Sequence, residues 1–246
     1  LKASNFPVYR NTEATYFGSG EEMFPVFLEE LKKAEKFILM EYFIIDKGSV
    51  WDEVLGILKE KTAQGVQVKL IYDDFGCLEK LPRRFYQQMN ELGIETYRFN
   101  RIRPALIIQM NNRDHRKICV IDNKVGFTGG INLADEYMNR IRRYGYWKDS
   151  AVMLKGEAVR SLTVMFLGMY TYLSGDQKTI DYNRYLEETP VSEGRGYYQP
   201  FADTPTDGAD VGLSMHLNIV NNAKRYIYID TPYLILNQDM QRALCL

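Results

Sequence analysis

The sequence predicts an α/β fold with a central, mostly buried mixed β-sheet flanked by helices on both faces. Two observations lead to this prediction: short apolar runs of strand length alternate with longer helical segments, and capping or turn residues separate the two kinds of segment. Alternation of this kind is typical of α/β domains. With 246 residues, of which 46% are apolar, the chain is long enough to form an ordinary buried core.

The first helix has the clearest start signal. Ser19 followed by Glu22 forms a capping box, which predicts a helix through about Ala34. The later elements follow from apolar period and from stop signals such as the glycine after residue 64. Strands are predicted at 36–46, 66–72, 94–99, 115–122 and 150–154, and a further strand ends at Thr128 after a turn at 122–124. Helices are predicted at 50–64, 81–92 and 157–173.

One charged residue interrupts the apolar strand 36–46. Glu41 stands between Met40 and Tyr42, and a buried carboxylate needs a partner. Two interpretations stay open: Glu41 lines a functional site, or it faces solvent at an edge.

The end of the chain is similar in its sequence pattern to the beginning of the chain. Residues 174–208 are rich in Gly, Pro, Asp, Glu and Tyr, which indicates a linker or crossing loop between a first unit at 1–173 and a further unit at 209–246. An offset of 189 places Ala34 on Ala223 and repeats the order of helix and strand in the same apolar phase. It also places His216 on a core-facing helical position, so His216 is predicted to be structural.

Charge and cysteine content exclude several function classes. The formal net charge of −1 lacks the basic footprint of a non-specific nucleic-acid binder. Three scattered cysteines do not predict disulfides, and two histidines do not build a metal centre, so we expect no metal or other cofactor and a reducing compartment. Cys119 is expected to be a small buried apolar residue.

A basic stretch contrasts with the acidic whole. Residues 101–148 contain ten Lys or Arg and four Asp or Glu. This stretch either draws in an anionic headgroup or membrane surface, or is an ordinary solvated face. Its exposed candidates are Arg101, Arg103, Arg113, Arg116, Arg140, Arg142, Arg143 and Lys148.

The most informative segment is the one from His115 onward. His115, Lys117 and Asp122 stand in His-Arg-Lys-Ile-Cys-Val-Ile-Asp, and Gly129 and Asn132 complete the spacing HxK(x4)D(x6)GxxN. Alternate residues of a strand share a face, so His115 and Lys117 would project side by side, as a nucleophile or base next to a cation that suits a phosphate. Asp122 has the opposite parity and is predicted to brace the site.

The residues after this strand predict an anion site. Gly129 and Gly130 are expected to leave backbone N–H groups open, and Asn132 is placed to cap a helix beginning at Leu133. Anions bind readily at such a helix start.

The segment from His115 to Asn132 resembles the signature of the phospholipase D superfamily, and the residues around it are similar to bacterial cardiolipin synthases. The resemblance covers nearly the whole chain and implies a phospholipase D-like fold. It is carried by the five motif positions and by the segments 71–76, 112–117, 128–137, 147–149 and 228–233.

The resemblance implies roles for individual residues. His115 would either attack the phosphodiester to form a phosphohistidine or serve as the acid for the leaving alcohol. Lys117 and Asn132 would stabilise charge on the phosphate oxygens, and Asp149 would hold the imidazole in its working tautomer. Asp149 has an alternative reading, because an aspartate at a strand start can merely cap a turn. The predicted substrate-binding residues are Gly129, Gly130, Arg113 and Arg116.

The implied reaction is the joining of two phosphatidylglycerol molecules to give cardiolipin and glycerol. Family members combine two HxK motifs, and the offset of 189 carries position 115 to 304, so this chain is expected to be an inactive first half of a longer protein. Its expected partners are phosphatidylglycerol, anionic membrane lipid, and a second half or a second copy. The full-length protein is expected at the bacterial cell membrane, with the catalytic region facing the cytoplasm and this piece itself soluble.

Three alternatives remain open. A hydrolytic phospholipase D would use water in the second step, and a single-motif phosphodiesterase or nuclease would assemble its site as a homodimer. A catalytically silent module would bind anionic lipid through the basic stretch.

Overall fold

The computed structural model describes residues 6–101, 112–175, 180–187, 191–203, 210–231 and 233–245. The chain forms two compact units, Val8–Gln199 and Leu1–Pro7 together with Pro200–Leu246. The boundary falls within the predicted linker 174–208. Parts of that linker, and Arg103 of the basic stretch, lie outside the described residues.

A seven-stranded mixed sheet organises the larger unit, in the order β1-β7-β6-β5-β2-β3-β4. The neighbours β2, β3 and β4 are parallel, and the remaining neighbouring pairs are antiparallel. This confirms the predicted mixed sheet. The strands are β1 (Thr12–Phe17), β2 (Phe37–Tyr42), β3 (Gln67–Asp73), β4 (Ile94–Phe99), β5 (Lys117–Ile121), β6 (Val125–Gly129) and β7 (Ala151–Gly156).

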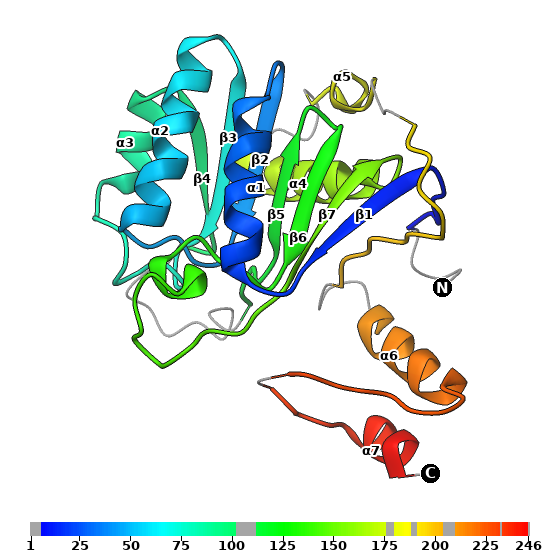
Figure 1. Cartoon of the computed structure of the whole chain (residues 1–246). Helices are drawn as coiled ribbons and strands as arrows, with labels where there is room; N and C mark the ends of the chain where they lie inside the picture. Colours follow the sequence, from blue (N-terminus) through cyan, green and yellow to red (C-terminus); the bar gives the residue numbers. More distant parts are fainter. Residues whose placement is uncertain are drawn as a thin grey trace. The chain divides into compact units, whose positions relative to one another are not determined.

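Helices cover both faces of this sheet, as predicted. Figure 1 shows α1 and α2 on one face and α4 on the other. The helices of this unit are α1 (Gly20–Lys32), α2 (Ser49–Ala63), α3 (Phe85–Glu91), α4 (Val159–Ser174), α5 (Tyr182–Leu186) and the short 3-10 helix η2 (Asp135–Met138).

The start of α1 follows the predicted capping box. Ser19 Oγ accepts from the backbone N–H of Glu22 at 3.2 Å, and the Glu22 carboxylate accepts from the N–H of Gly18 at 2.8 Å. The return bond thus reaches one residue further back than the usual box, and the helix N-terminus is satisfied on both sides.

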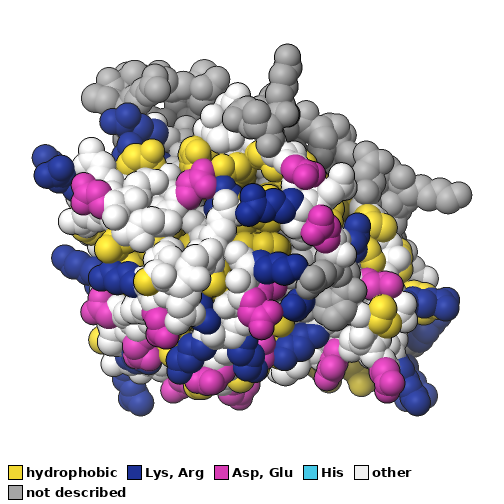
Figure 2. All heavy atoms as spheres, turned by 90° about the horizontal axis from the view of Figure 1, so that it is seen from above, with side chains coloured by type: hydrophobic (Ala, Val, Ile, Leu, Met, Phe, Trp, Pro, Cys, Tyr) yellow, Lys and Arg dark blue, Asp and Glu magenta, His cyan; other side chains and the backbone are white. Residues whose placement is uncertain are grey.

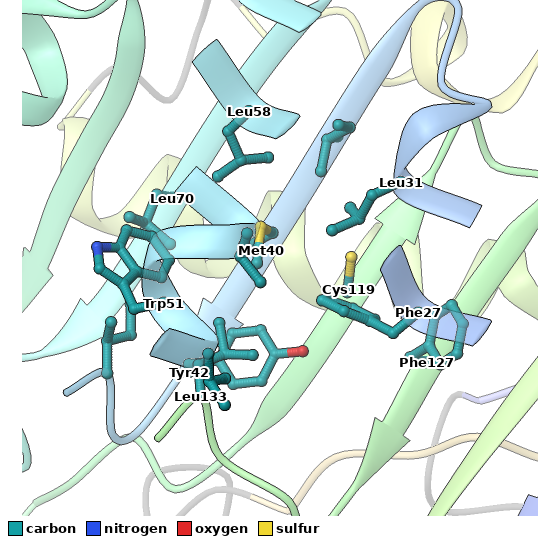
Figure 3. Packing of buried hydrophobic residues seen from close by; sticks show 14 of the residues in the cluster. Phe27, Leu31, Met40, Tyr42, Trp51, Leu58, Leu70, Cys119, Phe127 and Leu133 are labelled. Carbon is teal, nitrogen blue, oxygen red and sulfur yellow. The ribbon is translucent and has the colours of Figure 1, made fainter. Parts of the chain in front are cut away.

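The main core lies between the sheet and the α1–α2 layer (Figure 3). Met40, Tyr42 and Cys119 point into it from β2 and β5, and the Phe27 ring meets the Phe127 ring edge to face at 5.2 Å. Cys119 is fully buried, which confirms its predicted apolar role. Because side chains alternate along a strand, the intervening residues of β2 and β5, including Glu41, face the α4 layer.

The sequence pattern gives no signal for β1. This strand pairs with β7 alone at the edge of the sheet, and only its two terminal residues are buried. A mostly exposed edge strand shows little apolar alternation, so sequence reasoning missed it.

The smaller unit contains α6 (Val211–Asn222) and α7 (Gln238–Cys245). Helix α6 matches the helix expected from the repeat, but the expected strand after it is not formed among the described residues of this unit. A strand needs a sheet neighbour to be stable, and the described part of this unit offers none. His216 is exposed and its Nδ1 lies 2.7 Å from Gly212 O, so its predicted core position is wrong.

Within the described part of the chain, we find no helix with the length and apolar character needed to cross a membrane.

Candidate active site

His115 and Lys117 meet at the start of strand β5. Lys117 Nζ lies 3.1 Å from His115 Nδ1 and donates to the backbone oxygen of His115 at 2.5 Å. The two side chains therefore lie side by side as predicted, although β5 begins at Lys117 and His115 lies two residues before it. When the ammonium donates to Nδ1, the neutral ring carries its proton on Nε2. Attack by Nε2 would require that proton to move to Nδ1.

Both groups are shifted toward their neutral forms. Burial, and next the charge of Lys117, lower the pKa of His115. Burial lowers the pKa of Lys117 to about 8, although the charges of Asp114, Asp149 and Asp73 act to raise it. At neutral pH the imidazole is therefore uncharged, while most of the lysine keeps its proton. A nucleophile beside a phosphate-binding cation requires this combination.

Phe43 completes the immediate surroundings of the pair. Its ring lies 4.7 Å from the His115 ring between centroids, and Lys117 Nζ lies 5.2 Å from the Phe43 centroid. Sequence reasoning missed this residue, because Phe43 is one apolar residue among many in the run 36–46. Its ring contributes to the burial that shifts both neighbouring groups.

The glycines after β6 serve close backbone packing. Gly130 N–H donates to Ser150 O at 2.9 Å, so the prediction of an open N–H group is wrong for Gly130. Gly129 pairs with Ala151 and has φ +154°, while a Cβ on Gly130 would collide with the Asp149 carboxylate. Small residues are needed here because β7 and Asp149 approach the backbone closely.

Asp149 lies close enough to act on the pair electrostatically. Its Oδ1 accepts from the N–H of Ser150 at 2.8 Å, and its charge raises the pKa of both His115 and Lys117. The proposed grip of Asp149 on the imidazole stays a prediction.

Asn132 fastens the end of β2 and does not cap a helix. Its Oδ1 accepts from Ile44 N–H at 2.9 Å, and the η2 helix that follows has no side-chain cap. The predicted cap is wrong because Leu133 is extended and bonded to the chain after β2: its N–H donates to Ile44 O, and its oxygen accepts from Asp46 N–H. A contact between Asn132 and phosphate stays a prediction.

Asp122 lies at the opposite end of β5 from His115. Its carboxylate accepts three backbone N–H groups, from Glu35 at 2.7 Å, Lys36 at 2.8 Å and Phe37 at 2.7 Å. These bonds fasten the connection between α1 and β2 to the end of β5. The geometry fits the predicted bracing role at a distance from the His115–Lys117 pair.

Asp73 organises the segment that leads into the motif. Its Oδ1 accepts from the N–H groups of Phe75 and Gly76, and these bonds form a turn directly after β3. Its Oδ2 accepts from Asp114 N–H at 2.9 Å, and its Oδ1 lies 3.2 Å from Arg113 Nη1. Asp73 therefore fixes two consecutive residues, Arg113 and Asp114, ahead of the His115–Lys117 pair.

Arg116 is directed away from His115 and Lys117. Its Nε lies 2.7 Å from Glu41 Oε1 and donates to Asp114 Oδ1 at 3.2 Å. Glu41 is fully buried with Arg116 beside it, so the interpretation that it faces solvent at an edge is wrong. Because Arg113 and Arg116 both bind carboxylates here, a role in headgroup binding stays a prediction.

A small, largely apolar pocket lies beside Lys117 on the α1–α2 side of the sheet. The pocket is lined by Met23, Tyr42, Lys117, Phe127, Thr128, Gly129, Ile131 and Ala151.

Among the described residues, no group of three or more His, Cys, Asp or Glu is arranged to hold a metal ion.

A closed loop precedes Asp149 and the start of β7. Asn139, with φ +52°, accepts from Trp147 N–H at 2.6 Å and donates to Trp147 O at 3.1 Å, and the Trp147 ring packs on Tyr137 at 4.6 Å. One side chain thus closes the loop at its base. The exposed residues are Arg140, Ile141, Arg142, Arg143, Tyr144, Gly145 and Tyr146.

Comparison with known proteins identifies a family to which this chain is similar. A family model described as cardiolipin synthase, PLD-like domain, matches residues 27–162. An uncharacterised protein of Streptococcus mutans is 46% identical over 243 residues, which cover 99% of this chain and 52% of that protein. A cardiolipin synthase of Geobacillus kaustophilus is 35% identical over 240 residues, which cover 97% of this chain and 47% of that enzyme. The chain spans about half the length of these curated relatives.

A solved structure shares the fold. The phosphatidylserine synthase of Haemophilus influenzae Rd KW20 matches with a TM-score of 0.55 and 16% identity, over 70% of this chain and 39% of that one. The family model covers more than half of the chain and includes the complete HxK(x4)D(x6)GxxN segment. The predicted resemblance is thereby confirmed: this chain belongs to the cardiolipin synthase family of phospholipase D-like proteins.

Proposed function

We propose that this chain supplies one half-site of an enzyme that transfers a phosphatidyl group between two phosphatidylglycerol molecules, giving cardiolipin and glycerol. The observation that carries the proposal is the contact between a neutral imidazole and a buried ammonium, His115 and Lys117, in a member of the cardiolipin synthase family.

The proposed reaction has two displacement steps at phosphorus. In the first, the imidazole of His115 forms a bond to phosphorus, and the bond to the headgroup glycerol breaks; an acid donates a proton to the departing oxygen. In the second, the hydroxyl of another phosphatidylglycerol displaces the histidine and gives up its proton to a base. Phosphorus keeps its oxidation state throughout, and one glycerol leaves for each cardiolipin formed.

Lys117 would stabilise the charge on the phosphate oxygens in both steps. A single donor aimed at a developing oxyanion contributes roughly 3 to 4 kcal/mol in well-studied enzymes. Burial beside Phe43 strengthens such an interaction because little water screens it.

The acid for the leaving glycerol is proposed to come from a second HxK motif in the same longer protein. Two facts support this: the helix of the expected repeat is present as α6, and the curated relatives are about twice as long as the chain. A second copy of this chain is the alternative source of the acid.

The loop 139–148 is proposed to face an anionic lipid surface. It contains four basic residues and no acidic one, and it exposes Ile141, Tyr144 and Tyr146. Tyrosine and arginine suit the headgroup region of a bilayer. By contrast, the face seen from above in Figure 2 carries basic and acidic side chains interspersed. Arg140 and Arg143 are partly engaged by Glu53 and Glu136, so the exposed Arg142 is the residue to test first.

The test of the reaction is product analysis with trapping of the intermediate. Full-length protein given phosphatidylglycerol labelled at phosphorus should release cardiolipin and glycerol, and a rapid quench should leave an acid-labile label on the peptide containing His115. Residues 1–246 contain only two histidines, so within this part of the protein His216→Phe is the matched control and should keep the label. A label that survives in His115→Ala would refute the assignment.

The same assay separates the rivals. Phosphatidic acid in place of cardiolipin would identify a hydrolase. Residues 1–246 alone should be inert toward phosphatidylglycerol, since loss of an acid alone removes roughly 10² to 10⁴ in rate. Activity of this chain that rises with the square of its concentration would favour the homodimeric phosphodiesterase. Lipid binding without any turnover of the full-length protein would favour the silent lipid-binding module.

A further inference from the structure

A buried charged cluster lies on the face of β2 and β5 opposite the His115–Lys117 pair. It comprises three carboxyl groups, Glu41, Asp73 and Asp114, and two guanidinium groups, Arg113 and Arg116. Helix α4 covers this face, and its charged residue, Arg160, donates to Leu186 O at the other end of the helix. Among the described residues, these five groups are in direct contact with one another, and Lys117 is a further cation on which the charges of Asp114 and Asp73 act.

The cluster holds one carboxyl more than it holds cations. If all three carboxyls were ionised, one of them would be buried without a guanidinium of the cluster to pair with it. A buried carboxyl in that position normally keeps its proton. The question is which of the three does so.

Hydrogen bonding singles out Glu41. Asp73 accepts three backbone N–H groups and contacts Arg113, and Asp114 Oδ1 accepts both the N–H and Nε–H of Arg116. Within the described chain, no aligned donor reaches either oxygen of Glu41 or the second oxygen of Asp114. Arg116 Nε lies only 2.7 Å from Glu41 Oε1, but its N–H is directed at Asp114 Oδ1.

A proton shared between these orphaned oxygens satisfies both carboxyls. Burial, and next the charge of Asp114, raise the pKa of Glu41 well above its ordinary value, although Arg116 acts to lower it. A hydrogen bond to Asp114 acts in the same direction as burial. The neutral Glu41 therefore donates, and the ionised Asp114 accepts.

We propose that Glu41 is a positioning residue of the catalytic site: its protonated carboxyl donates to Asp114 and so holds the Asp114–Arg116 segment that carries His115. His115 lies between the two residues that this proton fixes, and the charge of Asp114 acts on both His115 and Lys117. The predicted effect on turnover rests on the proposed function; the predicted proton does not.

Infrared spectroscopy of the 246-residue chain tests the proton directly. Wild type at neutral pH should show the carbonyl band of a protonated carboxyl that is sensitive to deuterium exchange. Glu41→Gln should remove this band, and Glu35→Gln, at a well-exposed glutamate, should leave it unchanged. A missing band in wild type, or one that survives in Glu41→Gln, would overturn the proposal.

Asp114→Asn provides an independent test of proton sharing. The amide can keep the contact of its oxygen with Arg116 and can donate to Glu41, and the remaining two carboxylates then match the two arginines. Glu41 should therefore ionise, and the band should vanish although Glu41 is still present. Persistence of the band in Asp114→Asn would show that the proton is not shared with Asp114.

The consequence for the site is read from His115. With only two histidines, the imidazole signals of His115 are assigned by comparison with His216→Phe. Glu41→Leu frees the Asp114 carboxylate, which should raise the pKa of His115, whereas Glu41→Gln should restore the wild-type titration. In full-length enzyme, Glu41→Leu should lower kcat by ~10-fold or more with little change in KM, and Glu41→Gln should recover most of it. Equal titration curves in all three proteins would reduce Glu41 to a purely structural residue.

The infrared and product measurements separate the proposed proton on Glu41 from the proposed reaction. If the band is lost as predicted but the full-length protein makes no cardiolipin, the proton on Glu41 is supported and the proposed reaction is wrong. If the protein makes cardiolipin but Glu41 is not protonated, the proposed reaction is supported and the role of Glu41 is wrong.

Discussion

The two faces of strand β5 carry cations with opposite fates. On the α1–α2 side, Lys117 donates to the ring and backbone oxygen of His115, which are neutral acceptors, so its charge remains available to an anion. On the α4 side, Arg116 faces the carboxyls of Asp114 and Glu41, and its charge is compensated. The difference teaches that the parity of a residue in this segment decides whether its charge is left available or is compensated by buried carboxyls.

The largest expected effect comes from removing the imidazole. His115→Ala should lower turnover of the full-length protein by roughly 10⁴-fold or more, because nucleophile and acid are both indispensable to a two-step route. Cardiolipin formation measures the loss, and circular dichroism should show an intact fold. His216→Phe, at an exposed position, should retain near-wild-type activity.

Removing the positive charge of Lys117 should lower turnover nearly as severely. Lys117→Met keeps the length of the side chain and deletes the ammonium, so kcat should fall by about 10²- to 10³-fold. Lys59→Met, at an exposed position of α2, is the control and should change little. A small loss in Lys117→Met would place the phosphate elsewhere.

The alkaline limb of the pH profile should report the same lysine. Below a pKa of about 8 the side chain of Lys117 is charged, and above it the charge is lost, so kcat/KM should decline as pH rises through about 8. Lys117→Arg cannot deprotonate in this range and should abolish that limb, whatever its rate at the optimum. An unchanged limb in Lys117→Arg would assign it to another group.

A smaller effect is expected where the glycine meets Asp149. A Cβ at Gly130 would displace the carboxylate of Asp149, and misplacement of this size can reduce kcat by about 10- to 10²-fold. Gly56→Ala is the matched control, because open space surrounds Gly56 on α2, where alanine should stabilise the helix by ~0.5 to 1 kcal/mol. Full activity in Gly130→Ala would argue against any role of Asp149.

The smallest effect on activity is expected at the far end of β5. Asp122→Asn weakens three charge-assisted bonds, so denaturant unfolding should show a loss of roughly 1.5 to 3 kcal/mol. The kcat of the folded fraction should stay near wild type. Loss of kcat at unchanged stability would turn Asp122 from a brace into a participant in the chemistry.

Local rules predicted the features that depend on neighbours in sequence. The strand period of two places His115 beside Lys117, and the capping box sets the start of α1. The layered α/β fold follows from the alternation of apolar segments in the same way.

The failures depend on partners remote in sequence. The side-chain oxygen of Asn132 accepts from the N–H of Ile44, and the N–H of Gly130 donates to the oxygen of Ser150, just before β7. Neither partner is near in sequence, so the sequence around Asn132 and Gly130 could not show that the predicted helix cap and open N–H group are absent. Glu41 finds Arg116 only because β2 and β5 are neighbours in the sheet. Strand order is the information that the sequence pattern lacked.

The exposed apolar segment of the smaller unit has a practical consequence. Tyr226–Ile229 and Tyr233–Leu236 expose large apolar side chains, with Tyr228 at 87% and Ile235 at 88%. Runs of aromatic and β-branched residues without charge tend to associate edge to edge and to form aggregates. Preparations of residues 1–246 should therefore be sensitive to concentration, and a lysine at position 228 or 235 would serve as a gatekeeper that keeps the chain dispersed.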